Sequence, residues 1–101
     1  MSVVMTMHWP EITSDLYQAA LSAVRWEEEP PQGAELHVSW FGGDGFHVVD
    51  VWQSQEDFER FVTERLDPVV REKLGVTSNP VVEYSPLNRR FVAPGVTGAS
   101  G

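Results

Sequence analysis

Residues 46–61 read Phe46-His-Val-Val-Asp-Val-Trp52-Gln-Ser54-Gln-Glu-Asp57-Phe58-Glu-Arg-Phe61 and predict a strand that runs directly into a capped helix. The apolar and aromatic residues up to Trp52 are typical of a buried strand. Ser54 can cap the helix that follows, and Asp57 stands three residues on, in capping-box spacing. Phe58 and Phe61 open an apolar stripe at helical spacing. The stretch therefore predicts an architecture, although it does not name a substrate.

The segments on either side complete a β-α-β-β-α-β order. A helix is expected to begin at Thr13 or Ser14, and Gly42 to Gly45 has the composition of a tight hairpin turn. Asp67-Pro68 is expected to restart the second helix, with Asp67 as its cap, and Gly75 to end it. The predicted strands cover residues 3–8, 35–41, 46–52 and 81–85.

This order predicts the ferredoxin-like split βαβ arrangement, an α+β fold. Four antiparallel strands form the sheet, and both helices lie on one of its faces. The 101 residues fit one domain, which we expect to span residues 1–93. Residues 94–101 are too small and polar to pack, so we expect a flexible C-terminal tail.

Composition excludes several classes of function. The net charge of −8, with only 7 Lys and Arg, argues against nucleic acid, which requires a basic surface. There are no cysteines, so disulfides, thiolate metal sites and a cysteine nucleophile are excluded. Neither a signal peptide nor a membrane span is predicted, and we expect a cytoplasmic protein with no membrane partner.

The alternation of the hairpin strands predicts a homodimer. An even-length turn gives one face Leu36, Val38, Trp40, His47, Val49 and Val51, and gives the other face His37, Ser39, Phe41, Phe46, Val48, Asp50 and Trp52. Both faces are too apolar for water, and the helices can cover only one of them. The simplest cover for the other face is a second copy of the chain, sheet against sheet.

The second of these faces carries the candidate chemistry. His37 is expected opposite or diagonal to Asp50, with Trp52 beside them, and an imidazole oriented by a carboxylate can act as a general base. The simpler alternative is that Asp50 forms a structural ion pair and His37 is an ordinary polar residue near a strand end. Ser39 lies nearby, but a flat sheet offers neither a nucleophile elbow nor an oxyanion hole for a serine hydrolase.

No metal is expected. By the alternation, His37 and His47 point to opposite faces, so they cannot share an ion within one subunit, and no His-x-His or Glu-x-x-His spacing occurs. The glycines at 42–45 join two strands and lead to no helix, so they are not a phosphate-binding loop.

The pattern Trp52-x-Ser54-x-x-x-Phe58, with the strand before it and Asn88 to Phe91 after the last strand, resembles dimeric α/β-barrel proteins. Among these it is similar to antibiotic biosynthesis monooxygenase-like domains and to small uncharacterised actinobacterial members. The resemblance covers roughly residues 1–93. It implies two sheets that form a barrel in a homodimer, with a pocket in each subunit between sheet and helices.

The resemblance also implies ligand-binding positions. In the oxygenases of this superfamily, the tryptophan that matches Trp52 lines the pocket. Their first strand often carries an asparagine, where this chain offers Thr6 and His8. The haem-degrading members use a histidine about ten residues after the tryptophan; here that region holds Phe61 and Val62, so no haem or other cofactor is expected. The expected ligand-binding residues are Trp52, Phe58, Phe61, Ser39 and His8.

Three functions stay open from the sequence. The first is a cofactor-free monooxygenase or a cyclase or isomerase, in which His37, oriented by Asp50, takes a proton from a small aromatic or polyketide-like substrate. The second is a non-catalytic module that binds a small hydrophobic ligand in the same pocket. The third is a structural dimer that works through its outer surface.

Overall fold

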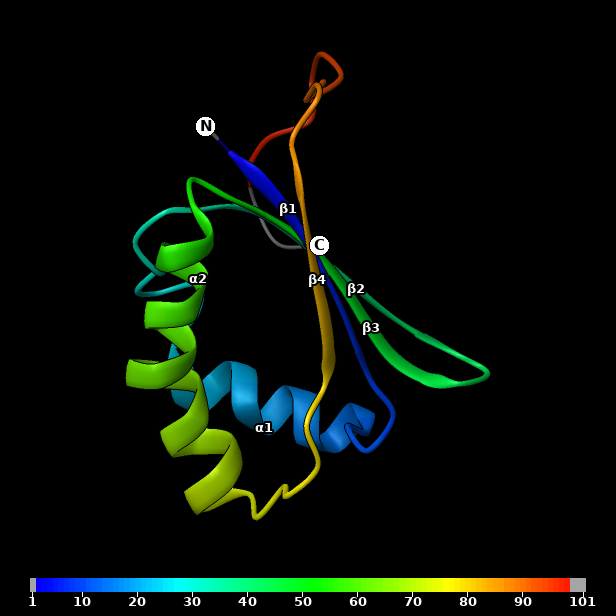
Figure 1. Cartoon of the computed structure of the whole chain (residues 1–101), viewed down its shortest axis with the longest axis vertical. Helices are drawn as coiled ribbons and strands as arrows, with labels where there is room; N and C mark the ends of the chain where they lie inside the picture. The colour runs from blue at the N-terminus through cyan, green and yellow to red at the C-terminus, as the bar shows by residue number, and fades with distance from the viewer. Residues whose placement is uncertain (1, 99–101) are drawn as a thin grey trace.

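Four strands form one antiparallel sheet, and the helices cover one of its faces (Figure 1). The computed structural model describes residues 2–98. The sheet has the order β2-β3-β1-β4, and all three pairings are antiparallel. The predicted ferredoxin-like βαββαβ arrangement is confirmed. Its strands are β1 (Val3–Trp9), β2 (Ala34–Gly42), β3 (Gly45–Trp52) and β4 (Val81–Pro86), and its first two helical segments are α1 (Ser14–Val24) and α2 (Gln55–Phe61).

The core lies between the helices and the inner face of the sheet. Because β1 and β3 pair in register, Met5 stands opposite Asp50 and Met7 opposite Val48, and these side chains point toward the helices. The helices contribute aromatic and branched side chains to the same layer. Buried members of this core are Met5, Met7, Trp9, Ile12, Val24, Phe46, Val48, Trp52, Phe58, Phe61, Val69, Val70 and Val76.

Two predicted caps start the helices. The Thr13 hydroxyl accepts a hydrogen bond from the Leu16 N–H at 3.2 Å, which starts α1. The Ser54 hydroxyl accepts one from the Asp57 N–H at 3.1 Å, which starts α2. Each cap satisfies a backbone donor that has no partner within its own helix. The strand therefore passes into the helix at Ser54, as the sequence predicts.

The second helix does not stop and restart at Asp67, and that expectation was wrong. Asp67 has helical dihedral angles (φ −58, ψ −43) and makes no side-chain cap. The helix continues from α2 through two π-helical segments, η1 (Val62–Leu66) and η2 (Pro68–Lys73). Pro68 has no N–H, and its ring would crowd the carbonyl four residues back, so the wider π-helical turn accommodates it. The helix ends before Gly75 (φ +69), as predicted.

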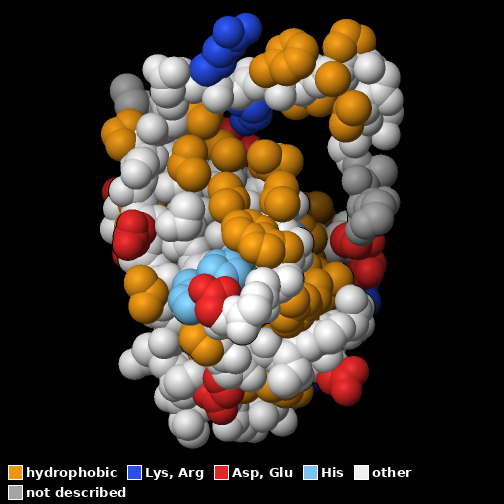
Figure 2. All heavy atoms as spheres, turned by 90° about the vertical axis from the view of Figure 1, so that its right-hand side faces the viewer, with side chains coloured by type: hydrophobic (Ala, Val, Ile, Leu, Met, Phe, Trp, Pro, Cys, Tyr) orange, Lys and Arg blue, Asp and Glu red, His pale blue; other side chains and the backbone are white. Residues whose placement is uncertain are grey.

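The outer face of the sheet is not covered by a helix (Figure 1). Figure 2 shows this face, with hydrophobic side chains around a group of histidine and acidic side chains. Leu36, Val38 and Trp40 are exposed on it, as is Val81 on β4. The segment after β4 reaches the opposite edge of the sheet, because Arg90 pairs with Glu35 at 2.5 Å.

Two boundary expectations touch residues outside the described part of the chain. The domain was expected to span residues 1–93, and residue 1 lies outside. The tail was expected over 94–101; of these, residues 99–101 lie outside, and Val96 within the described part is exposed. Among residues 2–98, no helix combines the length and apolar character that crossing a bilayer requires.

The β2–β3 turn provides a test of the fold. Gly45 has φ +112, and a Cβ there would lie 2.7 Å from the Pro10 Cα, so Gly45→Ala is expected to lower the free energy of unfolding by about 1–3 kcal/mol. The neighbouring Gly43 has open space around its Cβ position and serves as the control. Urea denaturation measures both variants; equal stability of Gly45→Ala and Gly43→Ala would contradict the tight approach to Pro10.

Candidate functional site

A chain of hydrogen bonds crosses the inner face of the sheet. His37 on β2 and Asp50 on β3 are Cα partners, and the His37 Nδ1 lies 2.7 Å from the Asp50 Oδ1. The other carboxylate oxygen accepts from the Trp52 indole N–H at 3.0 Å. On the far side of the imidazole, the Tyr17 hydroxyl from α1 lies 2.9 Å from the His37 Nε2. Four side chains from three elements thus form one continuous network.

The network fixes the protonation pattern of the imidazole. Asp50 is only 3% exposed, and as a carboxylate it can only accept hydrogen bonds. The His37 Nδ1 must therefore carry a proton and donate it to Asp50. In neutral His37 the Nε2 is then the acceptor, and the Tyr17 hydroxyl donates to it. The arrangement holds a basic nitrogen toward a phenol, which is the geometry that proton transfer needs.

An apolar cavity of about 90 Å³ lies beside this network. Tyr17, His37 and Asp50 are among its lining residues, and Phe58 and Phe61 from α2 contribute aromatic parts. The remaining lining comes from both layers of the fold, including Met5, Met7, Trp9, Ile12, Ala20, Leu21, Val24, Trp26, Phe46, Val48, Leu66 and Val70. The surface of the cavity is therefore almost entirely apolar, and the polar atoms of the hydrogen-bond network lie directly behind it.

A wider groove of about 500 Å³ lies next to the cavity, between the second helix and β4. Burial, with a smaller effect of Glu59, raises the pKa of Tyr84 in this groove. The groove also contains Arg71 and Glu59. The two spaces share part of their walls, because both are lined by Met7, Trp9, Phe58 and Leu66.

The structure brings together most, but not all, of the residues that the sequence singled out. His37, Asp50, Phe58 and Phe61 line one cavity. Trp52 lies behind the wall: it is 0% exposed, packs against both phenylalanines and binds Asp50 through its indole N–H. A role of Trp52 in contacting ligand stays a prediction.

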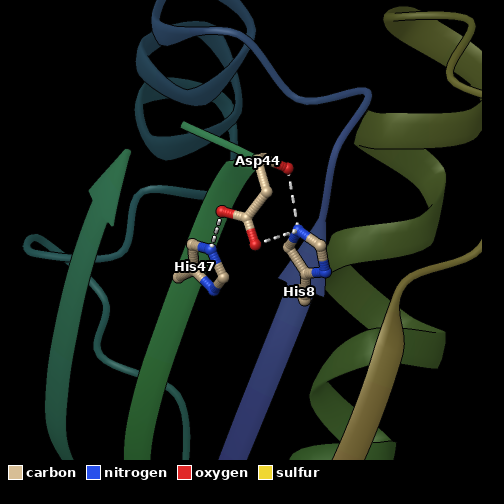
Figure 3. Close-up of side chains that lie close together, drawn as sticks. All are labelled: His8, Asp44 and His47. Atoms are coloured by element: carbon tan, nitrogen blue, oxygen red, sulfur yellow. Dashed lines mark hydrogen bonds and ion pairs between the residues drawn. The ribbon is translucent and has the colours of Figure 1, made fainter. Parts of the chain in front are cut away.

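Ser39 and His8 lie away from the cavity. Ser39 shares the inner face with His37 but stands farther along β2, outside the lining that the described residues form. His8 is the Cα partner of His47 and shares the outer face with it and Asp44 (Figure 3). His8 points away from the cavity because successive side chains of a strand alternate between faces, and its neighbours Met7 and Trp9 point inward.

Two residues of the site were not anticipated. Tyr17 fits the apolar stripe of α1, and only the packing of α1 on β2 brings its hydroxyl to His37. Trp26 follows Arg25, which ends α1 in the left-handed conformation (φ 55) and turns the chain back toward the core. The Trp26 ring lies 4.9 Å from the His37 ring and edge-on to Trp52 and Phe61. The sequence signal for both residues is their type: tyrosine and tryptophan combine an aromatic ring with a polar atom, and they often bring that atom into a site.

Comparison with known proteins supports the fold alone. The chain matches no protein-family model and no curated protein. A solved structure, the NE2512 protein of unknown function from Nitrosomonas europaea, superposes with a TM-score of 0.62 and 15% sequence identity. The match covers 93% of this chain and 95% of that chain. It agrees with the ferredoxin-like arrangement along nearly the whole length.

The protonation pattern can be tested with Asp50→Asn. In the wild type, ¹⁵N–¹H correlation spectra of His37 are expected to show the proton at Nδ1. The amide that replaces the carboxylate has only one oxygen for two donors, so the variant is expected to weaken the His37 bond and lose about 1–3 kcal/mol of stability. An unchanged imidazole spectrum in a folded Asp50→Asn protein would contradict the role of Asp50 in orienting His37.

Proposed function

We propose that this protein binds a small aromatic or similarly flat apolar molecule between sheet and helices, and that Tyr17 and His37 transfer a proton during a reaction of that molecule. One observation carries the proposal: the hydrogen-bonded residues Asp50, His37 and Tyr17 all line one apolar cavity. A buried carboxylate that orients an imidazole, which in turn contacts a hydroxyl, is the usual construction of a general base.

The proton would pass from the substrate to Tyr17 and from Tyr17 to His37. A substrate phenol or acidic C–H gives its proton to the Tyr17 oxygen as the Tyr17 hydroxyl proton passes to the His37 Nε2, 2.9 Å away. The substrate becomes an anion, and His37 becomes an imidazolium that the neighbouring Asp50 carboxylate stabilises. The apolar lining suits such a step, because electrostatic interactions are stronger in surroundings of low polarity.

The volume of the site bears on ligand size. A cavity of about 90 Å³ is smaller than the roughly 150 Å³ cavity that accepts benzene, so a ring needs some widening. A movement of Leu66 would open the cavity into the adjoining groove and provide this space, because Leu66 lines both. Leu66 belongs to the π-helical segment η1, and such widened turns recur at functional sites. We infer that ligands enter through the groove and that one- or two-ring molecules fit best.

The reaction class is proposed from the resemblance of residues 46–61 to antibiotic biosynthesis monooxygenase-like domains. In a cofactor-free monooxygenase, the substrate anion passes an electron to O₂ and then combines with it. In a cyclase or isomerase, the same anion attacks or is reprotonated within the substrate. Both reactions start with the proton transfer assigned to Tyr17 and His37, and neither requires a cofactor.

We also propose that the functional unit is a homodimer that joins the outer sheet faces as an α/β barrel. Leu36, Val38, Trp40 and Val81 are between 44% and 61% exposed on a sheet face without a helix cover. Leu36, Val38 and Trp40 follow one another on the outer face of β2, and exposed apolar surface of this kind marks an interaction site. A two-fold pairing of identical faces is the commonest way to cover it.

The second candidate function is a binding module without catalysis. The observation that favours it is the complete satisfaction of the polar network: among the described residues, every buried side-chain nitrogen or oxygen has a hydrogen-bond partner. A network of this kind can serve to hold α1 on the sheet and to orient a ligand. A structural dimer that uses only its outer face is the third possibility.

Tyr17→Phe separates catalysis from binding. It keeps the ring that packs on Phe46 and removes the hydroxyl, so ligand binding measured by tryptophan fluorescence is expected to change little. Turnover, followed by mass spectrometry with one- and two-ring phenols and enolisable ketones under air, is expected to fall about 10²–10⁴-fold.

Ser22→Ala is the control, since it removes an exposed hydroxyl from the same helix, outside the lining of both the cavity and the groove. It should retain turnover. Wild-type binding without turnover of any compound would favour the binding module, and turnover by Tyr17→Phe at the wild-type rate would contradict the proton path.

The dimer is tested by Val38→Lys, which places a charge on the outer face. The wild type is expected to have the mass of a dimer in light scattering, and the variant that of a monomer, because a buried unpaired ammonium is costly. Val96→Lys is the control: Val96 is 63% exposed but lies in the C-terminal segment. A monomeric wild type, or dimers in all three proteins, would contradict this interface.

A further inference from the structure

A second group of ionisable side chains lies on the outer face and plays no part in the proposed reaction. His8 on β1, His47 on β3 and Asp44 in the β2–β3 turn converge there (Figure 3). The His47 Nε2 lies 2.6 Å from the Asp44 Oδ1, and the His8 Nε2 lies 2.8 Å from the Asp44 carbonyl oxygen and 3.6 Å from its Oδ2. One donor atom of each residue lies within 4.8 Å of the others.

The two imidazoles are held in place by the sheet. His8 and His47 are directly opposite each other in the β1–β3 pairing, and their rings stack with centroids 4.4 Å apart and planes 8° apart. Trp40, the β2 partner of His47, stacks on the other side of the His47 ring at 5.0 Å. Three parallel rings therefore stand in one row across three strands. The row restricts the tilt of His47 and presents both Nε2 atoms to the same turn.

The turn is equally constrained. Asp44 occupies a two-residue connection, because Gly42 and Gly45 are still paired in the ladder. Gly45 lies so close to Pro10 that a Cβ would meet the Pro10 Cα at 2.7 Å. The backbone that carries Asp44 is thus fixed against the end of β1, where His8 is located. In the single subunit the Asp44 carboxylate is largely exposed to solvent, so an ion can reach it before the outer faces of two subunits join.

We propose that His8, His47 and Asp44 bind a divalent transition-metal ion, with Zn²⁺, Co²⁺, Ni²⁺ or Cu²⁺ as the suitable class. Two imidazole nitrogens and one carboxylate oxygen are ligands that these ions prefer, whereas Ca²⁺ and Mg²⁺ require more oxygen ligands than the described residues offer here. Three protein ligands leave at least one position for water. The site is independent of the Tyr17–His37–Asp50 network, which lies on the opposite face of the sheet.

Metal binding requires a small rearrangement. At a metal–ligand distance of about 2.0 Å, tetrahedral ligand atoms lie about 3.3 Å apart, so the group must tighten slightly. Each Nε2 now faces an Asp44 oxygen and carries a proton or shares one with it. On binding, that proton leaves to solvent or is replaced by one on Nδ1, and the metal takes the freed electron pair. Because the His8 and His47 rings are nearly parallel, the His8 ring, which has no stacking partner on its other side among the described aromatic contacts, must also tilt so that both Nε2 lone pairs point at the ion, and the exposed Asp44 side chain can follow.

The experiment uses the full chain without an affinity tag. Zn²⁺ titration by calorimetry is expected to give one ion per chain, and bound Co²⁺ is expected to show ligand-field absorption. In histidine NMR spectra, the imidazole signals of His8 and His47 should shift with Zn²⁺ while those of His37 stay in place. His37 is therefore an internal control in the wild-type protein.

Single variants test each ligand. His8→Gln, His47→Gln and Asp44→Asn are each expected to weaken Zn²⁺ binding more than about tenfold, since even outer-shell partners of a metal are worth that much. Asp67→Asn, an exposed carboxylate on the second helix, should bind as the wild type does. The absence of saturable binding, a shift of His37 instead, or wild-type affinity in the His47→Gln protein would overturn the proposal.

Discussion

The buried carboxylate of Asp50 is the constraint on which the rest of the inner face depends. A charge this deep in an apolar layer is tolerated only when its oxygens are hydrogen-bonded, and here the His37 imidazole and the Trp52 indole fill both. These two bonds join β2, β3 and the strand-to-helix junction. They also orient the imidazole toward α1, so a single requirement, satisfying one carboxylate, sets both the packing of the strands and the direction of the basic nitrogen.

Much of the fold, and part of the candidate site, could be predicted from local sequence. The strand period of two placed His37 and Asp50 on one face, and the capping residues Thr13 and Ser54 marked the starts of the helices, because both signals act within a few residues. Pro68 was harder. Its missing N–H is visible in the sequence, but whether a helix breaks or widens depends on the burial of Val69 and Val70 beyond it, which favours continuing the helix into the core.

The remaining features depend on contacts between segments far apart in the chain. Tyr17 reaches His37 only because α1 crosses the sheet at a particular angle, and a helical stripe does not encode that angle. The grouping of His8 with His47 depends on the β1–β3 register, which no turn fixes, since an entire helix and a strand separate β1 from β3. The strand alternation places His37 and His47 on opposite faces of the sheet, but it does not show that His8 lies beside His47.

The β2–β3 hairpin limits where this chain can accept inserted residues. Loop tips are usually where a protein accepts inserted residues. Here the two-residue turn places the Trp40–His47 pair on the outside and the His37–Asp50 pair on the inside of the same two strands. One additional residue in the turn would offset β2 against β3 and turn His37 away from Asp50. This exposed turn is therefore a poor place for length variation, and relatives that share the inner hydrogen bonds should keep the same spacing between Trp40 and His47.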